Sequence, residues 1–356
     1  MTSERIDGLD VWRAVFLTLG VCLHTTDAKH VPAEYLIQIL SSMFRMGAFM
    51  AIAGVLSGIV LHSRHPRVWF HKKMIQLGIP MLVGLLVTNT LLYPLTHSIE
   101  LYHMWFLISL LVYCTILYIG NIYFTTREYD VTSYLDISEM KLVPAMLVVM
   151  AFTIVTVFAT QATFYVLPAM KRVSDLTCET VQYVAPFLLG YFYGKYQSVR
   201  DLANSNNVAL VILIICSLVP MSIFVYIYGY EALDGFGQHQ TIIKTFTYSS
   251  VMYPIICLIL QQAFKIRNYS EKIIKFSKSS YTIYLIHFPI AGYALVYIPS
   301  SSSYLLDYII RIAFVLTASY WFHLLVVRSK LMTFLFNGKP MRVRARYKAS
   351  LGAVRL

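Results

Sequence analysis

Long apolar stretches alternate with short polar connections along the whole chain. An α-helix needs about 20 residues to cross the roughly 30 Å hydrocarbon core of a bilayer. Stretches of about this length run through residues 10–27, 36–61, 74–95, 104–124, 142–162, 180–196, 208–228, 242–263, 280–298 and 304–327. The sixth is the weakest, because it is short and holds Pro186, Gly190 and Gly194. The pattern predicts an all-α polytopic membrane protein with about ten transmembrane helices.

The distribution of basic residues predicts the orientation of these helices. The N-terminus and every second connection carry 22 of the 29 Lys and Arg residues, the intervening connections carry 3, and the rest lie within spans. Because cytoplasmic connections are enriched in Lys and Arg, we expect both termini to be cytoplasmic. We find no internal repeat, so residues 1–356 are expected to form one membrane domain that ends in a basic cytoplasmic tail at 328–356.

The composition supports this class and argues against others. Hydrophobic residues make up 58% of the chain and charged residues 13%, whereas a soluble domain carries roughly 25% charged residues. The net charge of +12 does not indicate nucleic-acid binding, because the basic residues lie between apolar runs as topology signals. The five cysteines have no spacing typical of a metal site or a disulfide framework, and no metal is expected.

Two ionisable residues share one face of the first apolar stretch. Arg13 and His24 are eleven residues apart, so they project within about 20° of the same direction and are separated by about 16 Å along the axis. Charged groups inside a span are costly and usually face a cavity or a partner. The pair therefore indicates two polar sites at different depths along one route across the membrane.

Structural roles for both residues stay open at this stage. Arg13 can extend to the inner interface with Asp10 as its partner three residues earlier. His24 can simply form a hydrogen bond with a neighbouring helix. Asp27 lies about one turn beyond His24, where it is able to orient the imidazole.

Further candidates lie in or near other spans. Arg45 enters the second span from the outside and is either functional or an interfacial anchor. His287 is followed by Pro289, which weakens the local helix and can open room for a ligand, although a core histidine is the alternative. Lys72 and Lys73 end a basic cytoplasmic stretch that contacts lipid headgroups or holds the phosphates of a nucleotide-like ligand.

These sites coincide with the pattern of a known family. The first span resembles the opening of the integral membrane acyltransferases of family 3, in which Arg is followed after ten residues by His. The similarity continues in order through FRMGAFMAIAG, LGIPM at 77–81, HMWFLISLLVY from His103, APFLLGYFYG from Ala185, SSYTIYLIHFP and FLFNGKP at 334–340. The LGIPM and FNGKP stretches look most like the glucans biosynthesis protein C branch, which succinylates periplasmic glucans.

The resemblance implies a function for this set of residues. It implies transfer of an acyl group, succinyl or acetyl, from cytoplasmic acyl-CoA to a hydroxyl of an extracytoplasmic glycan. His24 would be the catalytic base, and Arg13 would act with Lys72 and Lys73 on the donor. The positions that match the family around a substrate cavity are Arg45, His103, Trp105 and His287, and we add Asp10 and Asp27 to them.

Two departures from the family pattern concern this cavity. Gln76 stands in the expected donor region where the family often has Arg, and Ala53 replaces the Ser of a Ser-Gly pair in the second span. The implied setting is the inner membrane of a bacterium, with the lipid bilayer, a glycan acceptor and glycan-synthesis proteins as partners. The alternative is a transporter or flippase for a lipid-linked sugar or small anion, although the paired repeats common in transporters are not found.

Overall fold

The computed structural model describes residues 6–26, 32–63, 65–126, 140–165, 171–228, 241–265, 269–298 and 303–339, and all regular elements in these ranges are helices. In chain order they are α1 (Asp7–His24), α2 (Pro32–Ser63), α3 (Pro66–Lys73), the π-helix η1 (Met74–Gly78), α4 (Ile79–Thr96), the 3-10 helix η2 (Tyr102–Met104), α5 (Trp105–Thr126), α7 (Leu142–Tyr165), α8 (Lys171–Lys195), α9 (Gln197–Asn204), α10 (Asn207–Tyr228), α11 (Thr241–Lys265), α12 (Glu271–Tyr297), α13 (Tyr304–Arg328) and α14 (Lys330–Asn337).

The predicted all-α class is confirmed, and a helix coincides with each predicted stretch. Within the described ranges, five helical segments are long and apolar enough to cross a membrane, and a sixth qualifies if the bent pair α9 and α10 is one span. These five are Met43–Leu61, Pro66–Thr96, Tyr102–Tyr123, Leu142–Ala162 and Tyr304–Arg328. The total of ten spans and the cytoplasmic side of the termini stay predictions.

Two helices begin earlier than the apolar pattern predicts. Both α8 and α12 start nine residues before the predicted boundaries, at Lys171 rather than 180 and at Glu271 rather than 280. Their first turns are polar, so hydropathy marks only the later, apolar part of each helix. In α12 the side chain of Ser270 caps the start of the helix by accepting a hydrogen bond from the backbone N–H of Ile273.

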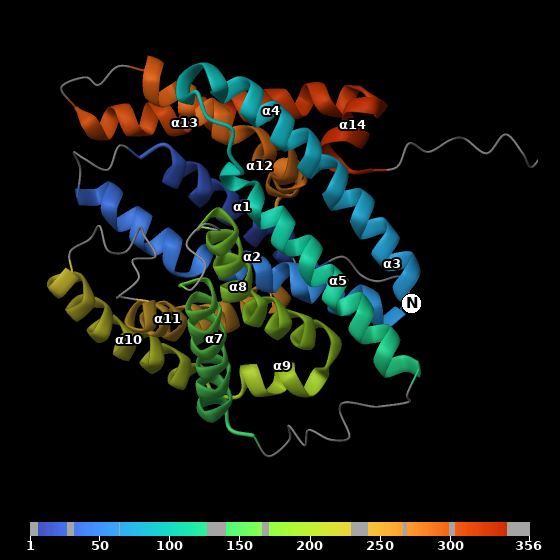
Figure 1. Ribbon diagram of the computed structural model, residues 1–356, viewed down its shortest axis with the longest axis vertical. Helices are drawn as coiled ribbons and strands as arrows, with labels where there is room; N and C mark the ends of the chain where they lie inside the picture. The colour runs from blue at the N-terminus through green and yellow to red at the C-terminus, as the bar shows by residue number, and fades with distance from the viewer. Residues whose placement is uncertain are drawn as a thin grey trace, which may run out of the picture.

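The helix that carries Arg13 and His24, α1, lies in the middle of the bundle (Figure 1). Figure 1 shows α4, α13 and α14 on one side, α7, α9, α10 and α11 on the other, and α1, α2, α8 and α12 between them. Helix α1 packs against α2, α11, α12 and α13. Because other helices surround it, its charged side chains can face protein instead of lipid.

The closest helix pair, α2 with α8, is built on small residues. A Cβ atom at Gly54 or Gly58 would lie 2.0 Å from the carbonyl oxygen of Phe187 or 2.3 Å from that of Tyr191. On α8, a Cβ at Gly190 would lie 1.9 Å from the carbonyl oxygen of Ala51. Both helices therefore carry a Gly-x-x-x-Gly pattern that lets the backbones touch. The glycines that weaken 180–196 as an apolar stretch serve this contact.

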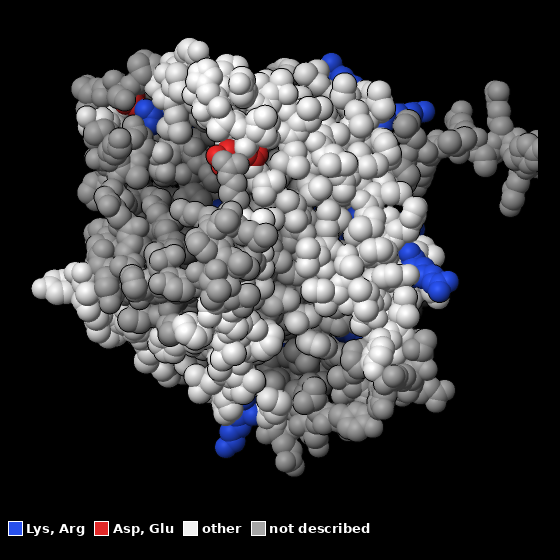
Figure 2. Space-filling view, viewed as in Figure 1, with Lys and Arg blue, Asp and Glu red and all other residues white. Residues whose placement is uncertain are grey.

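The outer helices expose apolar side chains to the surroundings. Leu86 of α4 is 70% exposed, Val155 of α7 is 64% exposed and Trp321 of α13 is 63% exposed. Figure 2 shows a face on which few described residues are charged. Such continuous apolar exposure is unfavourable in water and typical of a surface that contacts lipid.

Candidate functional site

Two neighbouring cavities lie along one face of α1. We call them the Arg13 cavity, of about 380 Å³, and the His24 cavity, of about 420 Å³. Asp10 and Arg13 line the first, and the residues from Phe16 to His24 on the same face line the second. The predicted alignment of Arg13 and His24 is therefore present, but they lie in adjoining cavities rather than in one.

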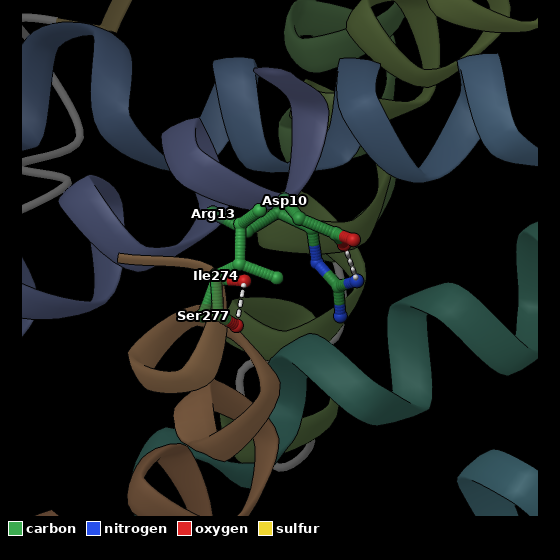
Figure 3. Close-up of polar contacts among 4 residues, drawn as sticks. All are labelled: Asp10, Arg13, Ile274 and Ser277. Carbon is green, nitrogen blue, oxygen red and sulfur yellow. Dashed lines mark hydrogen bonds and ion pairs between the residues drawn. The ribbon is translucent and has the colours of Figure 1, made fainter. Parts of the chain in front are cut away.

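Arg13 both pairs with a carboxylate and lines its cavity. Its Nη1 lies 3.3 Å from Oδ1 of Asp10, and the two side chains are 28% and 20% exposed. Figure 3 shows both side chains projecting from α1 beside Ile274 and Ser277 of α12. The structure thus combines the two sequence-based alternatives for Arg13, because the ion pair with Asp10 leaves the guanidinium at the cavity.

Three lysines add to the positive charge of the Arg13 cavity. Lys73, which the sequence predicts, lines it together with Lys278 of α12 and Lys339 after α14. Lys72 is exposed and is not among the lining residues, because it projects from another side of α3. Gln76 also lines the cavity. Four cations against the single carboxylate of Asp10 make this an electropositive chamber.

The LGIPM and FNGKP stretches meet at the edge of this chamber. Pro80 lacks the N–H that would bind the carbonyl of Gln76 four residues earlier, and that carbonyl instead accepts a hydrogen bond of 3.0 Å from the hydroxyl of Tyr281. Gly338 has a φ of +58°, and a Cβ there would lie 2.4 Å from Cα of Gln76. Only glycine fits this close approach, which places Lys339 at the cavity.

A buried polar chain anchors the same segment. The hydroxyl of Thr282 donates to Oδ1 of Asn337 at 2.9 Å, and Nδ1 of His323 lies 2.9 Å from that hydroxyl. Because the hydroxyl has given its proton to Asn337, His323 is the donor in the second bond. These contacts join α12, α13 and the end of α14. The sequence pattern predicts no helix in this region, yet α14 helps to form the cavity.

The His24 cavity places three histidines near one another. The ring of His24 lies 5.4 Å from the ring of His287 and 4.8 Å from the ring of Phe288, centroid to centroid. The ring of His103 lies 5.2 Å from that of His287. Among the described residues no hydrogen bond occupies a nitrogen of His24. Asp27, the predicted partner of His24, lies outside the described residues.

One backbone carbonyl fixes the other two histidines. The carbonyl oxygen of Tyr284 accepts from Nε2 of His103 at 2.9 Å and from Nδ1 of His287 at 2.8 Å. The hydroxyl of Tyr284 in turn donates to the carbonyl of His103 at 2.5 Å. A carbonyl only accepts hydrogen bonds, so these two nitrogens carry protons. His103 and His287 therefore have defined orientations, while His24 is open to the cavity.

Arg45 supplies an unpaired cation beside His24. In the described part of the chain its Nε is buried without a hydrogen-bond partner, and no described carboxylate forms an ion pair with it. A Cβ at Gly20 would lie 2.7 Å from its Nη1, so the guanidinium packs against α1 one turn before His24. Arg45 thus lines the cavity as a cation without an ion pair to any described carboxylate.

The remaining wall of the His24 cavity includes residues that sequence reasoning missed. Trp105 lines it as predicted, and its ring stacks on Tyr183 at 5.8 Å. Tyr102, Glu179 and Phe288 also line it. No spacing rule could find these three, because they come from different elements that only tertiary packing brings together. Among the described residues, no group of His, Cys, Asp and Glu is arranged to hold a metal ion.

Comparison with known proteins gives this arrangement a family. Residues 6–324 match the model described as "Acyltransferase domain". The chain is similar to proteins named "Glucans biosynthesis protein C" from Salmonella paratyphi B and Salmonella typhi. Each is 24% identical over an alignment of 388 positions that covers 97% of this chain and 97% of the relative. No solved structure matches the chain. Because the family match covers nearly all of the helices that form the two cavities, the chain belongs to this acyltransferase family and is an acyltransferase.

Proposed function

We propose that the protein is a transmembrane O-acyltransferase that moves an acyl group from cytoplasmic acyl-CoA to a hydroxyl of an extracytoplasmic glycan. The observation that carries this proposal is the pair of adjoining cavities, one lined by cations and one by histidines, along a single face of α1. The thioester arm of a donor held in the Arg13 cavity would extend into the His24 cavity and meet the acceptor there. The family match favours this enzyme over a transporter or flippase.

The Arg13 cavity suits the donor. Coenzyme A carries several phosphate charges, and phosphates bind to Arg and Lys side chains. Arg13, Lys73, Lys278 and Lys339 supply four cations around one chamber. Lys278 and Lys339 are not among the donor-binding residues expected from the sequence, whereas Lys72 is expected but does not line the cavity. Gln76, in place of the Arg that is frequent in the family, offers an amide, and Lys278 of α12 with Lys339 after α14 supplies the charge that it lacks.

The His24 cavity suits the chemical step. A sugar hydroxyl is a weak nucleophile, and a histidine that removes its proton activates it for attack on a thioester. In the proposed step the hydroxyl oxygen bonds to the acyl carbon, His24 takes the hydroxyl proton, and the carbon–sulfur bond breaks. The CoA thiolate leaves and recovers a proton from His24. An acyl-histidine intermediate is the alternative order of events.

Arg45 supports succinyl rather than acetyl as the acyl group. An acetyl group offers no anion to the buried guanidinium, whereas the free carboxylate of a succinyl group would form a charge-assisted pair with it. The guanidinium packs against Gly20, which precedes His24 by four residues, or about 6 Å along the helix axis. That separation suits an acyl group whose thioester carbon is beside His24 while its carboxylate reaches Arg45.

The acceptor side supports a carbohydrate. Trp105 and Tyr102 give aromatic surface of the kind that packs against sugar rings, and Glu179 gives a carboxylate that can accept hydrogen bonds from hydroxyls. The printed name of the relatives refers to glucans, so a periplasmic glucan is the proposed acceptor. In this proposal the protein spans the inner membrane of a bacterium and works beside glycan-synthesis proteins.

The test is loss of acylation on removal of the base. We expect His24→Gln to lower the acyl content of extracytoplasmic glycan at least about a hundredfold, which is the usual contribution of a general base. Mass spectrometry of glycan from cells with each variant measures this, since succinyl and acetyl differ in mass and charge. His71→Gln is the matched control, because His71 is exposed on α3 and lines neither cavity. Normal acylation by a folded His24→Gln protein would refute the assignment.

A further inference from the structure

Three aromatic residues, Phe49, Phe106 and Tyr284, line both cavities. They come from α2, α5 and α12, and each marks the point along its helix at which the lining changes from one cavity to the other. On α2, Arg45 and Met46 line the His24 cavity, whereas residues from Ala53 onward line the Arg13 cavity. The shared residues therefore lie in one layer between the two chambers.

The three rings form a continuous edge-to-face series. The rings of Phe49 and Phe106 are 5.0 Å apart at an interplanar angle of 82°, and those of Phe106 and Tyr284 are 5.6 Å apart at 60°. Edge-to-face contacts of this kind are favourable and hold rings together without polar bonds. The three rings thus form a packed aromatic layer that both cavities share.

The members of this layer differ in how firmly they are held. The hydroxyl of Tyr284 donates to the carbonyl of His103, which ties its ring to the segment before α5. Phe49 and Phe106 have no polar side-chain atoms, so only packing holds their rings. A molecule that passes between the cavities would therefore displace the two phenylalanines against a fixed tyrosine.

We propose that Phe49, Phe106 and Tyr284 form an aromatic partition that determines the width of the acyl group able to reach His24. The inference rests on the proposed function, because Arg13 and His24 are about 16 Å apart along α1 and a donor bound at Arg13 must extend its thioester arm through this layer. Narrow, unbranched acyl groups pass between the rings. Branched or aromatic acyl groups do not.

The first experiment changes the width of the partition. Membranes with the full-length protein are given acetyl-CoA or isobutyryl-CoA and glycan acceptor. We expect Phe106→Ala and Phe49→Ala to raise the ratio of isobutyryl to acetyl transfer by roughly tenfold or more. We expect the same of Phe106→Leu, a milder variant that preserves packing. Phe336→Ala is the control, because Phe336 of α14 is a buried ring that lines neither cavity.

An unchanged ratio in folded partition variants would overturn the proposal, and so would an equal rise in Phe336→Ala, because general loosening would then explain the effect. A rise confined to the partition variants supports it.

The second experiment does not depend on acyl transfer. Ala53 lines the Arg13 cavity just beyond the partition, so Ala53→Cys in oriented proteoliposomes can be labelled with a membrane-impermeant maleimide and read by site-resolved mass spectrometry. We expect labelling from one side only, and labelling from both sides when Phe106→Ala is added. Labelling of the single variant from both sides would overturn the partition. One-sided labelling without any acyl transfer from CoA would reject the proposed function while the barrier stands.

Discussion

Arg13 and Arg45 are both cations on the central helices, but among the described residues only Arg13 has a carboxylate partner. Asp10 lies 3.3 Å from Arg13, whereas the Nε of Arg45 has no partner among the described residues. A buried cation without a counter-ion is unfavourable, so Arg45 is expected to acquire its anion from a ligand.

The role of Arg45 predicts a change in donor preference. Arg45→Gln should lower succinyl transfer about tenfold or more relative to acetyl transfer, because a lost charge-assisted bond costs about 1.5–3 kcal/mol. Competition between succinyl-CoA and acetyl-CoA, with glycan products separated by mass, measures the ratio. Arg45→Lys, which keeps the charge, should restore part of the preference. Equal loss of both activities would instead assign Arg45 to the developing oxyanion.

The lysines predict a donor-binding effect. Lys339→Ala should raise the KM for acyl-CoA by roughly tenfold with a smaller change in kcat, because phosphate contacts contribute binding that is the same in ground and transition states. Lys72→Ala is the matched control, since Lys72 is exposed and outside the cavity. Initial rates against acyl-CoA concentration give both constants. Similar values of KM for the two variants would contradict the assignment.

The sequence indicates the residues whose roles depend on local spacing. Arg13 and His24 are found because their separation on one helix fixes a common face. Lys278, Lys339 and Glu179 are not found, because their places in the cavities depend on how separate helices pack. The link from the Tyr284 carbonyl to His103 and His287 joins residues 181 apart in one case, and it uses backbone atoms that no side-chain pattern reveals.

At the scale of elements, the apolar pattern predicts the existence of helices better than their ends. The polar first turns of α8 and α12 carry no hydropathy signal that distinguishes them from connections. The helix α14 is apolar, but its 8 residues are too few to mark a span. The π-helix η1 is likewise unpredicted, since its register depends on Pro80 and on the contact of Tyr281 with Gln76.

The contact between α2 and α8 predicts a stability effect. Gly54→Ala should destabilise the protein by about 1–3 kcal/mol, because its Cβ would clash with the Phe187 carbonyl. Gly120→Ala is the control, since nothing lies within 4 Å of its Cβ position and alanine favours a helix more than glycine does. Thermal unfolding in detergent, followed by loss of monodisperse protein, compares the two. Equal melting temperatures would show that the backbones do not need this close approach.

At the scale of the whole molecule, two cavities that meet at an aromatic layer link a cation-rich region to a histidine-rich region. The alternation of Lys and Arg between connections predicts that the Arg13 end is cytoplasmic. Helix α1 crosses from one cavity to the other, so its direction fixes the side from which each substrate enters. Donor and acceptor are therefore expected to approach from opposite sides of the membrane.

Acyl transfer in sided proteoliposomes tests this requirement most directly. Purified protein is reconstituted in a known orientation, and acyl-CoA and glycan are supplied on chosen sides. Mass spectrometry then measures how much of the glycan is acylated. We expect acylated glycan when acyl-CoA is on the side of the Arg13 cavity and glycan is on the side of the His24 cavity, and little product when both are on one side. Equal acylation with both substrates on the same side would contradict it.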